Sequence, residues 1–155
     1  MCSCVTSRTT GVCAVVFGGW RASPAAAPFE NVSMSRDERI AARLIDAIAS
    51  MIPASCTTSI VAGRLEVAID GEWWVTVDFG PDTRVPDREA YLAYNVLDAI
   101  QDVIVRSSTR PWPPANDPTY LPCPEAAVRG GLLMVWFGPE AQPTVTLPPI
   151  DLATV

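Results

Sequence analysis

The apolar residues of this chain change their spacing three times, and these changes constrain the fold more than any other feature. Residues 36–52 and 88–106 have apolar side chains at helical spacing, whereas residues 57–79 contain short β-branched and alternating runs. Residues 132–137 and 145–147 add two apolar runs of strand length. Helical faces repeat about every 3.6 residues and strand faces every second residue. The pattern therefore predicts an α+β fold in which an antiparallel sheet of about five strands (order α-β-β-β-α-β-β) has two amphipathic helices packed on one face.

Both predicted helices begin at residues that favour helix starts. Ser35 and Glu38 have the spacing of a capping box, in which each side chain accepts a hydrogen bond from the backbone of the other residue. Pro53 stops this helix, and Asp87 is expected to cap the second one. Residues four and seven positions apart share a helical face. One such face of the second helix is expected to be solvated, with an acidic partner-facing or cation-binding stripe as the alternative, and it carries Tyr91, Asn95, Asp98 and Asp102.

The strands around Asp70 and Gly71 form a predicted hairpin, because this dipeptide favours tight turns. A three-residue loop over residues 69–71 places the apolar side chains of both strands on one face, whereas a two-residue loop does not. We therefore expect the three-residue loop, with Val67 opposite Trp73. The inner face then carries Leu65, Val67, Trp73, Val75, Val77 and Phe79, and the outer face carries Glu66, Ala68, Glu72, Trp74, Thr76 and Asp78.

Residues 1–33 show no consistent period, and we expect a poorly structured leader ahead of a single α+β domain over residues 34–155. Residues 11–20 are largely apolar, follow Arg8 and precede small residues, which loosely resembles a secretory signal. Three interpretations stay open: a start codon assigned upstream of a true start at Met34, a flexible natural tail, and an export signal.

The chain has no histidine, no lysine and a formal net charge of −6. These absences exclude His-dependent triads, His metal sites, Schiff-base lysines and the P-loop lysine. The acidic balance argues against binding to nucleic acid or to anionic membranes. No apolar run approaches the roughly 20 residues of a membrane-spanning helix. We expect a soluble, cytoplasmic protein without a cofactor, with export left open by the leader.

Two cysteines, Cys56 and Cys123, fall inside the expected domain. They are expected either as two buried thiols or as a disulfide. The cysteines lack the spacing of a zinc site, so no metal is predicted. The outer-face carboxylates Glu66, Glu72 and Asp78 could serve acid–base chemistry or bind a hard cation, but the same spacing is typical of a solvated strand face.

Residues 107–124 are rich in proline and predict a long extended loop. Trp112 and Tyr120 either pin this loop to the domain or mark a lid or docking segment. Tryptophan is enriched where proteins bind one another. The candidate binding residues are therefore Trp74, Trp112, Tyr120, Glu72 and Asp78.

The predicted element order resembles that of secretion chaperones, which are acidic α+β dimers that hold client segments. It also resembles the first five elements of a double-stranded RNA-binding domain. Both are resemblances of element order without a sequence motif, and we assign the chain to no family. We expect a non-enzymatic protein-binding domain, adaptor- or chaperone-like, whose partner is another protein or a second copy. The alternatives are a small enzyme or cation-binding domain that uses carboxylates, and a structural subunit of a larger assembly.

Overall fold

The computed structural model describes residues 34–79, 85–108, 110–115, 117 and 119–155, apart from the side chains of Trp73 and Trp74. The predicted leader lies outside this description, and the described elements belong to one unit, Ser33–Val155. The α+β class and antiparallel pairing are confirmed. In chain order the elements are α1 (Arg36–Ile48), β1 (Cys56–Val61), β2 (Arg64–Ile69), β3 (Glu72–Asp78), α2 (Arg88–Ser108), β4 (Pro124–Arg129), β5 (Leu132–Phe137), β6 (Val145–Thr146) and β7 (Ile150–Asp151).

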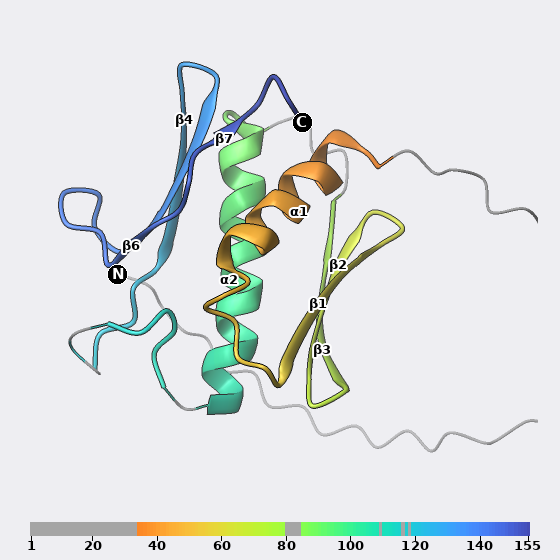
Figure 1. Cartoon of the computed structure of the whole chain (residues 1–155), viewed down its shortest axis with the longest axis vertical. Coiled ribbons are helices and arrows are strands. Elements are labelled where there is room, and N and C mark those ends of the chain that lie inside the picture. Colours follow the sequence, from red (N-terminus) through yellow and green to blue (C-terminus); the bar gives the residue numbers. More distant parts are fainter. Residues whose placement is uncertain (1–33, 80–84, 109, 116, 118) are drawn as a thin grey trace, which may run out of the picture. The chain divides into compact units, whose positions relative to one another are not determined.

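The strands are divided between two sheets rather than joined in one. The first sheet has the order β1-β2-β3, and the second has the order β4-β5-β6 with β7 also paired to β5. Helix α2 contacts both sheets, and α1 packs against α2 and β1 (Figure 1). The division follows from the breadth of the buried surface of α2, which covers about half of the helix circumference. The buried residues of α2 are Ala90, Leu92, Ala93, Val96, Leu97, Ile100, Gln101, Val103 and Ile104.

Helix α1 starts where the sequence predicts and ends four residues earlier, at Ile48 instead of residue 52. The capping box is present: Glu38 N donates to Ser35 Oγ at 3.2 Å, and Ser35 N donates to Glu38 Oε2 at 2.5 Å. The other carboxylate oxygen, Glu38 Oε1, accepts a hydrogen bond from Gly63 N at 3.0 Å. The cap of α1 is thereby joined to the turn between β1 and β2.

The turn between β2 and β3 has two residues, not the predicted three. Asp70 and Gly71 have φ angles of 51° and 81°, as in a type I′ turn. Ile69 pairs directly with Glu72 across this turn. The hairpin itself is confirmed, whereas the predicted loop length and the predicted pairing of Val67 with Trp73 are wrong.

A register shift in β3 restores the predicted apolar face from Val75 onward, but not at Glu72 and Trp73. Ala68 pairs with Trp73, but Val67 pairs with Val75, so that the register steps over Trp74. An extra residue of this kind is a β-bulge, which turns the following side chains to the opposite face. The apolar face is thus shared by Leu65, Val67, Val75 and Val77, all of which pack in or against the core.

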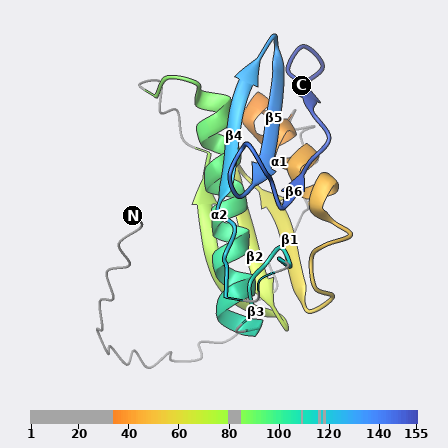
Figure 2. The ribbon, with the colours of Figure 1, turned by 90° about the vertical axis from the view of Figure 1, so that its left-hand side faces the viewer.

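The second sheet contains a strand that the sequence did not predict. β4 pairs with β5 from Pro124 to Arg129, and Gly130 and Gly131 form the turn with φ angles of 58° and 81°. The expected strand over residues 145–147 is short, and the C-terminal segment adds β7. Figure 2 shows the β4–β5 hairpin from a second direction. None of the helices within the described ranges is both long enough and apolar enough to cross a membrane.

Candidate binding site

Trp112 lies in the core. Its side chain is 4% exposed, and its ring meets Phe137 edge-on with the ring centroids 5.6 Å apart. The indole Nε1 donates a hydrogen bond to the carbonyl oxygen of Met51 at 2.8 Å. The prediction of an exposed contact residue is therefore wrong for Trp112, and this residue pins the loop to the domain, as the alternative prediction has it.

Gln101, in α2, also holds this loop in place. The sequence did not identify it as a structurally important residue. Its side chain is 4% exposed, and Nε2 donates to the carbonyl oxygens of Trp112 and of Pro122, the latter at 2.8 Å. Both N–H donors of the amide are satisfied, as buried polar groups require. The available signal was a polar residue within the apolar half of α2.

Tyr120 is 40% exposed and remains a candidate contact residue. Its hydroxyl stands over Gly138, where a Cβ would come within 3.3 Å of the oxygen. A surface hollow of about 360 Å³ lies beside it, lined by Pro114, Ala115, Asp117, Tyr120, Gln142, Pro143 and Thr144.

The predicted carboxylates do not converge. Asp78 Oδ1 lies 2.8 Å from Arg64 Nε across the β2–β3 pair, and its side chain is 71% exposed. Glu72 is at the opposite end of β3, roughly 20 Å away at the rise of a strand. Within the described ranges no three acidic or cysteine side chains come together as a metal site. The side chain of Trp74 lies outside the description, so its placement on a contact surface stays a prediction.

The two cysteines of the domain are separate thiols. Cys56 is buried at the start of β1, while Cys123 is exposed just before β4. The disulfide alternative is thus wrong for this structure, because the two sulfur atoms are not bonded to each other. Cys123 is also not buried, contrary to the two-buried-thiols alternative. Burial raises the pKa of the Cys56 thiol above its usual value.

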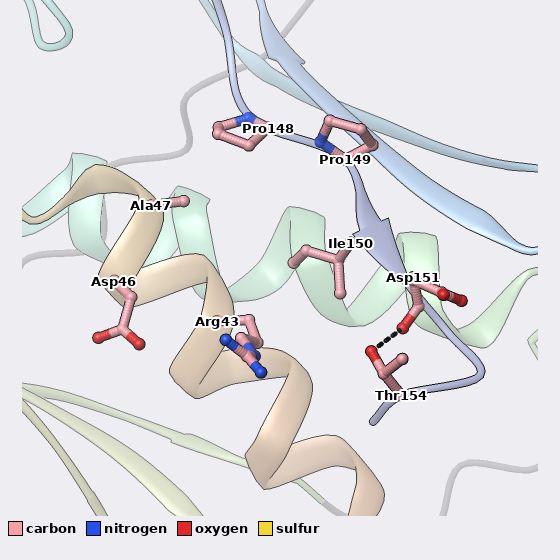
Figure 3. Close-up of a pocket in the computed structure, with 8 residues that line it drawn as sticks. All are labelled: Arg43, Asp46, Ala47, Pro148, Pro149, Ile150, Asp151 and Thr154. Atoms are coloured by element: carbon pink, nitrogen blue, oxygen red, sulfur yellow. Dashed lines mark hydrogen bonds between the residues drawn. The ribbon is translucent and has the colours of Figure 1, made fainter.

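A groove runs between α1 and the C-terminal segment (Figure 3). Its volume is about 460 Å³, within the range of roughly 300–1,000 Å³ that is usual for ligand pockets. α1 supplies one wall, and the segment around β7 supplies the other. The groove is lined by Arg43, Asp46, Ala47, Pro148, Pro149, Ile150, Asp151 and Thr154.

The groove has an apolar floor and a rim of charged side chains. Ile150 is 9% exposed and belongs to the core cluster, and Ala47 packs against that cluster. The guanidinium of Arg43 is exposed and has no ion-pair or hydrogen-bond partner among the residues that the structure describes. In Figure 3 the carboxylates of Asp46 and Asp151 point away from Arg43, to either side.

The C-terminal wall is fixed by its own hydrogen bonds. Asp151 Oδ1 accepts from Ala153 N at 2.9 Å, and the carbonyl oxygen of Asp151 accepts from Thr154 Oγ1 at 2.9 Å. β7 is paired to β5 through Ile150 and Asp151. The groove is therefore a preformed feature with one cation whose hydrogen-bond donors are available to a ligand.

The comparisons with known proteins give no relative for this chain. No protein-family model matches it, and neither the curated proteins nor the solved structures contain a match. Its function is therefore argued from the geometry alone.

Proposed function

We propose that this protein is a non-enzymatic peptide-binding module, and that the groove between α1 and the C-terminal segment takes an extended segment of a partner protein. The observation that carries the proposal is the unpaired Arg43 guanidinium above an apolar floor. Five N–H donors in a planar fork suit main-chain carbonyl groups and carboxylates. The floor of Ile150 and Ala47 suits an apolar side chain of the segment.

The charge of the protein selects the kind of segment. The chain carries a net charge of −6, and Asp46 and Asp151 flank the groove. Complementary charges guide protein partners toward each other and repel like-charged ones. The partner segment is accordingly apolar at its centre and basic at its ends, with its carbonyl groups accepting from Arg43.

Selection from a displayed library of random 12-residue peptides tests this function. Enriched peptides should combine apolar and basic residues, and Arg43→Gln should weaken their binding about tenfold, which corresponds to about 1.4 kcal/mol. Arg110→Gln is the matched control, because Arg110 is also exposed and does not line the groove. Peptides that bind Arg43→Gln as tightly as the unmodified chain would contradict the groove assignment.

The outer face of the first sheet is the second candidate surface for the same function. Glu66 and Asp78 lie on it, together with the hydroxyl residues Thr57, Ser59 and Thr76. The variants Glu66→Gln and Asp78→Asn distinguish the two surfaces, whereas Glu72, predicted for this face, pairs with the buried Ile69 and does not lie on it. The two variants leave peptide affinity unchanged if the groove is the site, and they lower it if the sheet face is.

A further inference from the structure

β4 is an edge strand whose outer side is open. In the described residues it pairs only with β5. Gly138 N donates to the carbonyl oxygen of Cys123 at 2.8 Å, just beyond the end of this ladder. Hydrogen-bonding direction alternates along an antiparallel strand. Every second residue after Cys123, namely Glu125, Ala127 and Arg129, therefore directs its backbone groups toward β5.

Ala126 and Val128 consequently direct their N–H and C=O groups away from β5, to the open edge. Their side chains pack against the core, so only the backbone is offered. No described residue outside β4 and β5 donates to or accepts from these groups. Such a row of unpaired groups is a template for another strand.

The sequence of β4 is complementary to itself. We propose that two copies of this chain pair through their β4 strands, antiparallel about a twofold axis at Ala127. In this register Ala126 of each copy lies opposite Val128 of the other, and each such pair exchanges both of its N–H···O bonds. Ala127 then faces Ala127 of the second copy in a position where the Cα atoms approach to about 4.5 Å, which suits a small side chain.

The same register brings opposite charges together. Glu125 lies opposite Arg129 of the second copy, and Arg129 lies opposite Glu125 of the second copy. Directly opposed residues of unlike charge stabilise an antiparallel pair. Glu125 is exposed and has no partner within the described part of the chain.

Arg129 is already held on the face where this pair would form. It contacts Glu140, and its Cζ lies 5.9 Å from the centroid of the Trp136 ring. Trp136 pairs directly with Glu125 across β4 and β5. Arg129, Trp136 and Glu125 therefore share the outer face of the second sheet, on which the charge pairs with a second copy would form.

The two edges of the first sheet lack this complementarity. β1 contains no charged residue, so no charge pair would fix a register there. β3 begins with Glu72 and ends with Asp78, and antiparallel self-pairing would bring acidic residues together. The partner of β4 is therefore a second copy.

The test is the oligomeric state of the full chain, measured by light scattering over a range of concentrations. The unmodified chain should show a concentration-dependent dimer. Ala126→Pro removes only an N–H group that points away from β5. Pro124, two residues earlier in β4, already occupies a position of the same orientation. The variant should therefore be a folded monomer. A chain that stays monomeric at every concentration, or a dimer that Ala126→Pro leaves intact, overturns the proposal.

Charge reversal tests the register itself. Glu125→Arg places arginines opposite each other, and Arg129→Glu places acidic residues opposite each other, so each variant should dimerise about tenfold more weakly. A mixture of the two variants restores both charge pairs, and native mass spectrometry should show mainly the heterodimer. A statistical mixture of homodimers and heterodimers would exclude this register.

Discussion

Replacing Gln101 with leucine tests how the long loop is held. The amide of Gln101 donates to two carbonyl groups of the loop, those of Trp112 and Pro122. Leucine removes both bonds and leaves two buried acceptors unsatisfied, at about 1–3 kcal/mol each. Some of this cost is offset, because an apolar side chain suits the surroundings of residue 101. We expect the free energy of unfolding to fall by about 2–4 kcal/mol.

Urea denaturation followed by tryptophan fluorescence measures this loss, with Trp112→Phe as the companion variant. Trp112→Phe keeps an aromatic ring against Phe137 but removes the bond to Met51 and part of the buried indole, so it should cost more than the roughly 1 kcal/mol of the hydrogen bond alone. Limited proteolysis should cut residues 110–123 of Gln101→Leu before the rest of the domain. A Gln101→Leu chain within about 0.5 kcal/mol of the unmodified one would refute the reasoning.

Three further variants test local features. Glu38→Gln should lower the free energy of unfolding by about 0.5–2 kcal/mol at pH 7, because hydrogen bonds from the backbone and side chain of Ser35 lower the pKa of Glu38. This contribution is complete above the unfolded pKa of about 4.3 and is lost as the pH falls through the pKa of the folded state. A stability difference between the two chains that persists in urea titrations at acid pH would contradict it. Asp98→Asn should stabilise the protein at pH 7 by about 0.2–0.5 kcal/mol, since burial, and then the charge of Asp102, raise the pKa of Asp98 and disfavour its ionised form. This stabilisation should vanish below the unfolded pKa of about 3.9. Equal denaturation midpoints of the two chains at pH 7 would count against it. Ala62→Asn should raise the melting temperature, with up to about 1 kcal/mol of stabilisation, because Ala62 has a strained φ of 48° in a turn that favours asparagine. A lower melting temperature would show that asparagine does not relieve the strain.

The features that could be predicted from the sequence are local ones. The capping box of Ser35 and Glu38 depends on residues three positions apart, and the turn at Asp70 and Gly71 depends on two neighbours. The capping box is present as expected, and the hairpin is present with a turn of two residues instead of the expected three. The bulge at Trp74 was not predictable from the sequence. The turn sets the pairing of the residues next to it, whereas burial in the core sets which face of β3 points inward, and the bulge reconciles these two requirements.

The remaining differences arise from contacts between distant parts of the chain. β4 contains proline and two alanines, which have weak strand propensity, and it is a strand because β5 pairs with it. Trp112 is buried because Met51 and Phe137 lie far away in the sequence but next to it in the fold. The groove joins Arg43 to the C-terminal segment, and no local pattern relates these two regions.

Nuclear magnetic resonance of the isotope-labelled chain, titrated with a selected peptide, tests the proposed function most directly. The account predicts that the largest shift changes occur at the backbone amides of Ala47, Ile150 and Thr154, and that in Arg43→Gln they require about tenfold more peptide. Shift changes confined to β1, β2 and β3, or to residues 110–123, would show that the peptide binds elsewhere and would contradict the groove as the binding site.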